Sequence, residues 1–177
     1  MNSINNKVIF VPACLLCPSF MASSKKKNTA WRQNIISYLN NNEYDIIQLP
    51  CPEASFNSEE TGIHRKPHGI KFYEELAGFK SHCLILSGEV INQIDAFVSK
   101  GYKVLAIMGI EHSPTCAANY IYTCRGMIKR KGIFFDAINS GLRHKNLEIT
   151  ILGINRRYPH KTIQALKELE QGMSCIG

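Results

Sequence analysis

The stretch Lys103-Val104-Leu105-Ala106-Ile107-Met108-Gly109 decides how this sequence is expected to fold. Its apolar residues follow one another without the alternation of a half-buried strand, a pattern typical of parallel strands that are covered on both faces. Four further runs along the chain have the same character. We therefore expect five strands, at residues 7–11, 45–49, 83–86, 103–109 and 148–152.

Helix-like segments lie between and after these strands. The last of them begins after Pro159, a residue type that is well tolerated at the start of a helix. Strand and helix alternate five times, which predicts an α/β fold: a three-layer, doubly wound, flavodoxin- or Rossmann-like domain over residues 1–177, with a five-stranded, mostly parallel sheet. Residues 53–67 show no clear periodicity and are expected to form a surface binding loop or lid. The expected helices cover residues 29–39, 69–77, 89–99, 128–140 and 160–171.

Composition and charge narrow the function classes. The chain has 177 residues, 45% of them hydrophobic and 20% charged, which suits one compact domain. Its apolar runs fall far short of the roughly 20 residues that span a bilayer, so we expect no membrane partner. We further expect a cytoplasmic protein that is a monomer or a homodimer. The 21 basic and 14 acidic residues give a formal net charge of +7. Nucleic acid is a minor hypothesis, because residues 25–27 and 125–145 are basic but no RNA-binding aromatic pair or zinc-finger spacing accompanies them.

Three cysteines follow the predicted ends of three strands. Cys14 comes after the first strand, Cys51 after the second and Cys116 after the fourth, and each lies within two residues of a proline that stiffens its loop. Ligands of doubly wound sheets bind at the carboxyl ends of the strands, so the three thiols are expected to converge. Such a set suits an iron–sulfur cluster or a zinc ion with an open position. The wide spacing matches no zinc-finger pattern and favours a cluster that the tertiary fold assembles.

The same cysteines carry a family resemblance. Ala13-Cys14-Leu15-Leu16, Cys51-Pro52-Glu53 and Ser113-Pro114-Thr115-Cys116 resemble motifs of the thiouracil desulfurase family, over about residues 7–136. The resemblance implies that these three cysteines hold a 4Fe-4S cluster whose fourth iron receives the sulfur of a thiocarbonyl substrate, and that Glu53 is the acid-base residue. Cys17 and Ala117 stand where the family typically has glycine. A divergent branch is indicated, so the fold and the cluster carry over better than the substrate does.

Other residues near these motifs are candidates for the site. Glu53 and Ser113 are expected in catalysis, and His112 and Asn119 in substrate binding, although turn or cap chemistry is an equal reading for Ser113 and His112. Asn119 is expected at a helix start. Arg65 is a substrate-binding candidate through the resemblance, and a solvated basic loop is its alternative. Cys17 could be a bystander, a fourth ligand or a redox thiol.

Three functions follow in order of preference. The first is a 4Fe-4S-dependent desulfidase that converts C=S to C=O in a small thiocarbonyl compound such as a thiolated pyrimidine. The second is a non-catalytic iron–sulfur or metal-binding protein in which Cys17 is the fourth ligand. The third is a nucleotide- or RNA-binding α/β module.

Overall fold

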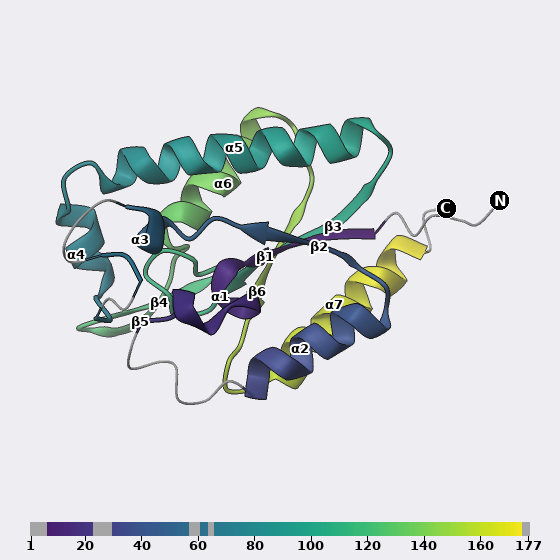
Figure 1. The fold of residues 1–177 in the computed structure, drawn as a ribbon, viewed down its shortest axis with the longest axis horizontal. Coiled ribbons are helices and arrows are strands. Elements are labelled where there is room, and N and C mark those ends of the chain that lie inside the picture. Colours follow the sequence, from purple (N-terminus) through teal and green to yellow (C-terminus); the bar gives the residue numbers. More distant parts are fainter. Residues whose placement is uncertain (1–6, 23–29, 57–60, 64–65, 175–177) are drawn as a thin grey trace.

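A four-stranded parallel sheet forms the centre of the protein. The computed structural model describes residues 7–22, 30–56, 61–63 and 66–174. The strand order is β2-β1-β3-β6 (Figure 1), which is the 2-1-3-4 order of a flavodoxin-like sheet when the four strands are numbered among themselves. The predicted α/β class is therefore confirmed, with four strands rather than five. The strands are β1 (Lys7–Pro12), β2 (Asp45–Leu49), β3 (Lys103–Ile110) and β6 (Thr150–Ile154).

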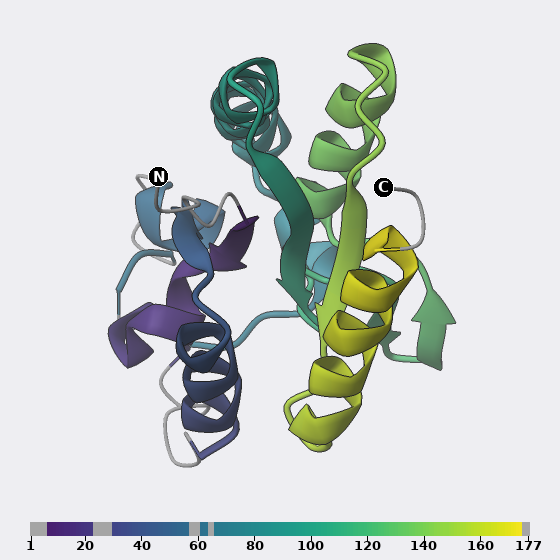
Figure 2. The ribbon, with the colours of Figure 1, turned by 90° about the vertical axis from the view of Figure 1, so that its right-hand side faces the viewer.

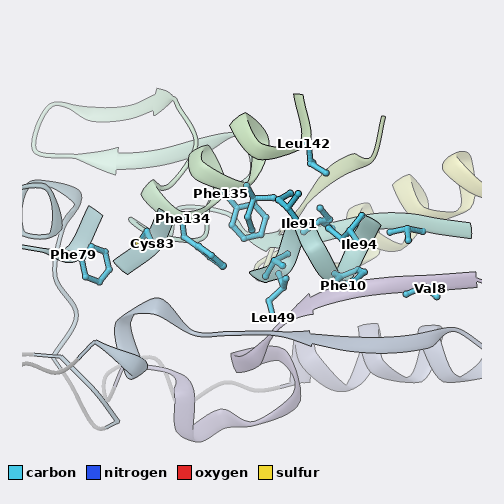
Figure 3. Packing of buried hydrophobic residues seen from close by; sticks show 14 of the residues in the cluster. Val8, Phe10, Leu49, Phe79, Cys83, Ile91, Ile94, Phe134, Phe135 and Leu142 are labelled. Carbon is cyan, nitrogen blue, oxygen red and sulfur yellow. The ribbon is translucent and has the colours of Figure 1, made fainter. Parts of the chain in front are cut away.

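Helices cover both faces of this sheet, which gives three layers (Figure 2). Successive residues of β1 point to opposite faces: Val8 and Phe10 pack with α5 and α6, whereas Ile9 and Val11 pack with α2 and α7. Both sets are fully buried, which explains why the strand has no polar alternation. Figure 3 shows the first cluster, with Phe10 and Leu49 of the sheet facing helices α5 and α6. The four helices are α2 (Ala30–Asn41), α5 (Phe79–Ser99), α6 (Ile133–His144) and α7 (Pro159–Ser174).

The strand predicted at residues 83–86 is wrong. This segment lies inside α5, a helix of 21 residues that also contains the predicted helix 89–99. The buried residues of α5 include Phe79, Cys83, Val90 and Ile94, which recur at helical spacing. Leu84 and Ile85 are 61% and 64% exposed, so the apolar run that suggested a strand does not lie on one buried face.

A β-hairpin replaces part of a predicted helix. Strands β4 (Tyr120–Thr123) and β5 (Gly126–Lys129) pair antiparallel outside the main sheet, so the helix predicted over 128–140 and the helix start expected at Asn119 are wrong there. Aromatic and β-branched residues of β4 favour a strand. Four short helical segments complete the described chain: α1 (Ala13–Leu16), η1 (Pro18–Phe20), α3 (Pro52–Ser55) and α4 (Ile70–Glu75). Within the described residues, no helix is both long and apolar enough to cross a membrane.

Candidate functional site

The three cysteines that follow strand ends lie around one cavity. Cys14 is in α1 directly after β1, Cys51 precedes α3 after β2, and Cys116 is in the loop after β3. All three line a cavity of about 340 Å³ at the carboxyl edge of the sheet. The short helices α1 and α3 mark this edge in Figure 1. Because the order of the sheet reverses between β1 and β3, this is also the position where doubly wound folds bind ligands.

The thiols are close enough to influence one another. Burial raises the pKa of the Cys116 thiol well above its ordinary value, and negative charge on Cys51, Glu53 and Cys14 raises it further. Three negative thiolates in one buried site repel each other. Protonation of the thiolates or binding of a cation relieves this repulsion. A metal that takes the place of the protons satisfies the same groups.

The donor chemistry of the cavity is that of three thiols. Among the described residues, no group of three or more histidine, cysteine, aspartate or glutamate side chains is placed closely enough to hold a metal ion. Cys14, Cys51 and Cys116 nevertheless line one cavity, and cysteine thiolates are the usual ligands of iron–sulfur clusters.

The loop that carries Cys116 is held by its own hydrogen bonds. The backbone N–H of Cys116 donates to Ser113 Oγ (3.1 Å), and the carbonyl of Cys116 accepts a hydrogen bond from Ile110 N (2.8 Å). Ser113 also lines the cavity. A Cβ atom on Gly132 would lie 2.4 Å from the carbonyl carbon of Thr115, so glycine at this position lets helix α6 approach the loop. Backbone hydrogen bonds and close packing against α6 therefore hold this loop in place.

Glu53 is buried between two other segments rather than exposed on a surface loop. It lies in the first turn of α3 and is 8% exposed. Tyr73 Oη donates to its Oε2 (2.7 Å), and Thr115 Oγ1 donates to its Oε1 (2.5 Å). Ser113 Oγ lies 3.3 Å from Thr115 Oγ1, so a chain of hydroxyl groups leads from one cavity-lining residue to another. Glu53 thus joins the loop of Cys51 to the loop of Cys116.

A buried arginine supports the segment that carries Cys14. Arg32 of α2 donates from Nε to the carbonyl oxygens of Cys14 (3.1 Å) and Leu15 (2.7 Å), and from Nη2 to that of Leu16 (2.6 Å). These are the carbonyl groups at the end of a four-residue helix, which lack partners inside that helix. Arg32 therefore fixes the position of Cys14 through the backbone.

His112 lies in the cavity wall and has a strained backbone. Its φ is +67°, a conformation uncommon for residues other than glycine. Its ring stacks on Tyr122, with ring centroids 4.5 Å apart, and both residues line the cavity. The Nδ1 atom of His112 is buried and has no hydrogen-bond partner among the described residues. That atom is available for a polar group of a ligand.

Asn119 and Cys17, two other predicted site residues, lie outside the lining of the cavity. Asn119 does not line the cavity; its side chain donates to Glu111 Oε1 (2.8 Å). Glu111 also accepts the backbone N–H groups of Asn119 and Tyr120, so it anchors the start of β4. Cys17 lies at the end of α1 outside the cavity lining, and hydrogen bonds from Ser19 lower the pKa of its thiol. Arg65 and the lysines at 25–27 lie outside the described residues.

Sequence reasoning missed several residues of the cavity. Arg156 follows β6 by two residues and lines the cavity, so the rule about strand ends that located the cysteines would also have indicated it. Tyr73 and Thr115, which hold Glu53, carried no such signal, because their role depends on packing between distant segments. Trp31 contributes an aromatic wall from α2.

The chain is similar to a protein of an archaeon. This relative is an uncharacterized protein of Methanocaldococcus jannaschii, 26% identical over 138 residues, which cover 76% of this chain and 78% of the relative. No family model and no solved structure matches the chain. The relative's description names no activity, so the chemistry must be argued from the cavity.

Proposed function

We propose that the protein is a 4Fe-4S-dependent desulfidase that removes sulfur from a small thiocarbonyl compound, such as a thiolated pyrimidine. Cys14, Cys51 and Cys116 hold the cluster. The observation that carries the proposal is that these three thiols, from three separate strand ends, share one cavity with the buried carboxylate of Glu53. The motifs that resemble the thiouracil desulfurase family contain the same four residues.

The proposed reaction replaces sulfur by oxygen without a change in oxidation state. A thiocarbonyl compound and one water give the carbonyl compound and hydrogen sulfide: the C=S bond breaks, a C=O bond forms, and both water protons end on sulfur. A cluster with three thiolate ligands would supply an open iron that acts as a Lewis acid toward the sulfur. No external oxidant or reductant is consumed.

The chain itself handles the protons. Glu53 lines the cavity and accepts two hydrogen bonds from hydroxyl groups, which fix the directions of its oxygens. It takes a proton from the attacking water and returns it to the departing sulfur. Ser113 and Thr115 link the cavity wall to Glu53 Oε1 and provide a second route for the same proton. Phe20, Met21 and Trp31 line the cavity with apolar groups, which limits the entry of further water.

Metal analysis tests the ligand set directly. We expect protein purified without oxygen to contain about four irons and four acid-labile sulfides per chain. Cys51→Ala should lose both, whereas Cys124→Ala should retain them, because Cys124 is exposed in the turn between β4 and β5. Cys17→Ala should also retain them, since Cys17 lies outside the cavity lining. Zinc in place of iron, or equal iron in Cys51→Ala and wild type, would contradict the proposal.

Sulfide release tests the activity. The iron-containing protein should release sulfide from 2-thiouracil or 4-thiouracil, and Glu53→Gln should lower the rate by about 10²- to 10⁴-fold with the iron content unchanged. Glu75→Gln is the matched control, because Glu75 is an exposed residue of α4. A cluster-containing protein that releases no sulfide from these or other thioamides would refute the desulfidase function and leave a cluster-binding protein.

A further inference from the structure

A second cysteine follows Cys14 by three residues, in the short helix beside the cavity. Cys14 lies in α1, and Cys17 is the residue at which this helix ends. The N–H of Cys17 donates to the carbonyl of Ala13 at 2.9 Å, which is the hydrogen bond of an α-helical turn. Cys14 and Cys17 therefore belong to one turn of helix, and both are free thiols. The proposed reaction uses only Cys14.

The spacing within this turn suits a disulfide bond. Residues three apart in an α-helix have Cα atoms about 5 Å from each other, because three residues rise about 4.5 Å and turn through most of a circle. Disulfides join cysteines whose Cα atoms are usually about 4.4–6.8 Å apart. Arg32 donates to the carbonyls of Cys14 and Leu15, which holds the backbone of the turn in this arrangement. Cys17 itself has extended torsion angles, φ −124° and ψ 113°, so its side chain is not confined to the directions of a helical residue.

The two thiols have different surroundings, which assigns them different steps of thiol chemistry. Cys17 is partly exposed and lies outside the cavity lining, so small molecules reach it without entering the cavity. Hydrogen bonds from Ser19 lower the pKa of its thiol against the effect of burial, and the charge of Arg32 acts in the same direction as Ser19. A lowered pKa favours the thiolate, which is the form that attacks a disulfide. Cys14 stands within the same turn, in position to attack a mixed disulfide on Cys17.

A packing role does not account for Cys17. A cysteine that fills space in a core is buried among apolar groups, as Cys83 is in α5. Cys17 is not among the buried residues of either core cluster. Cys124 is exposed like a surface cysteine, in the turn between β4 and β5, and the cysteine nearest to it in the sequence is eight residues away, at position 116. Cys17 combines exposure with a second thiol one helical turn away.

We infer that Cys14 and Cys17 form a reversible disulfide when no cluster is bound, and that this bond withdraws Cys14 from the ligand set until a reductant opens it. The oxidant is a small disulfide such as oxidised glutathione. The Cys17 thiolate attacks one of its sulfur atoms, so its S–S bond breaks, a mixed disulfide forms and one thiolate leaves. Cys14 gives up its proton and attacks the Cys17 sulfur, which releases the second thiolate. The two protein thiols lose two electrons and two protons in total, and the small disulfide becomes two thiols.

The consequence for the cluster rests on the proposed desulfidase function, in which Cys14 is a ligand, whereas the disulfide itself does not. One thiol cannot serve both bonds, so cluster and disulfide exclude each other. The disulfide would protect Cys14 in the empty site, because thiols reopen a disulfide but do not reduce a sulfinic acid.

The test uses the full-length protein, freed of metal by a chelator and treated with oxidised glutathione in the absence of oxygen. Mass spectrometry after alkylation of the free thiols should find Cys14 and Cys17 joined, with the loss of two hydrogen atoms, and a dithiol reductant should release both. Cys14→Ala should instead keep a glutathione on Cys17, because the attacking thiol is missing. Cys124 is the internal control: it should keep its glutathione in wild type for the same reason. Cys17→Ala should not form the disulfide.

Protein that holds its cluster is treated in the same way. Cys14 is then bound to iron, so the reaction should stop at the mixed disulfide on Cys17. Removal of the iron by a chelator should let Cys14 complete the disulfide and release glutathione. This order of events is expected only if one thiol serves both bonds.

The outcomes separate this inference from the proposed function. In metal-free wild type, a glutathione that stays on Cys17, or a bond from Cys14 to Cys51 or Cys116, would overturn the inference. The same disulfide in protein that keeps all its iron would overturn the exclusion and the role of Cys14 as a ligand. A Cys14–Cys17 disulfide in a protein that never holds iron would leave the redox pair standing and remove the desulfidase proposal. Iron that depends on Cys51, with no disulfide after the iron is removed, would do the reverse.

Discussion

Thr115→Val should destabilise the protein by removing one hydrogen bond to a buried carboxylate. Thr115 has no exposed surface, and its Oγ1 donates to Glu53 Oε1 at 2.5 Å. Valine keeps the branched shape of threonine and lacks the donor. Hydrogen bonds to charged groups contribute about 1.5–3 kcal/mol, more than bonds between neutral groups, because the acceptor left behind is a desolvated charge. We expect a loss of about 2–3 kcal/mol in the free energy of unfolding.

Thr162→Val provides the matched control. Thr162 is 2% exposed, and its Oγ1 accepts from Asn155 N (3.0 Å) and donates to the carbonyl of Gly153 (3.4 Å). The same substitution at a similarly buried position therefore removes only hydrogen bonds to neutral groups. It should cost about 1 kcal/mol.

Urea unfolding measures both values. Trp31 is the one tryptophan of the sequence and is buried, so its fluorescence reports on unfolding. The slope against urea should be the same in wild type and both variants, which shows that the same surface is exposed on unfolding. In the Glu53→Gln background, Thr115→Val should cost at least about 1 kcal/mol less than in wild type, because the acceptor is then uncharged. Equal costs for Thr115→Val and Thr162→Val would refute the argument that the Glu53 carboxylate makes this hydrogen bond special.

Two further predictions concern the support of the Cys116 loop and the far end of the sheet. Gly132→Ala should lower the free energy of unfolding by about 1–3 kcal/mol and lower the iron content, because its Cβ would lie 2.4 Å from the carbonyl carbon of Thr115. Gly88→Ala is the control: a Cβ there meets open space in α5, so this variant should raise the free energy of unfolding by up to about 1 kcal/mol. Urea unfolding measures both changes in stability. At the far end, burial acts to raise the pKa of Glu170, but hydrogen bonds from Tyr44 and Tyr38 and the charge of Lys7 lower it overall. The ionised carboxylate therefore stabilises the folded protein at pH values above the pKa that Glu170 has in the unfolded chain. This stabilisation is lost as the pH falls through the lower pKa of the folded protein. Glu170→Gln should therefore destabilise the protein at pH 7 and have a smaller effect at pH 3.

The fold was predictable where both faces of an element are buried. The apolar runs of β1 and β3 have side chains in both core clusters, and these strands begin at the predicted residues, Lys7 and Lys103. The run at Leu84 and Ile85 failed because an apolar run of three or four residues fits a strand and a helix equally well. The buried residues from Phe79 to Ile94 recur at helical spacing, and this longer pattern indicates a helix.

The candidate site was predictable to the extent that it depends on topology. Parallel strands end at one edge, so residues that directly follow them converge whatever the side-chain packing. This placed Cys14, Cys51 and Cys116 in one cavity. The burial of Glu53 could not be predicted in the same way, because it requires hydroxyl groups from Tyr73 and from the loop of Cys116, two segments that are distant in sequence.

The backbone of each of the three cysteines is held by hydrogen bonds that do not use its sulfur atom. The backbone at Cys14 is held by the guanidinium of Arg32, and the backbone at Cys116 by Ser113 and by Ile110. The carbonyl of Cys51 accepts hydrogen bonds from α3. None of these contacts uses a sulfur atom, so replacement of a cysteine by alanine leaves the scaffold that presents the other two. A loss of iron in Cys51→Ala can then be assigned to the missing ligand, because the same variant should unfold in urea close to where the metal-free wild type does.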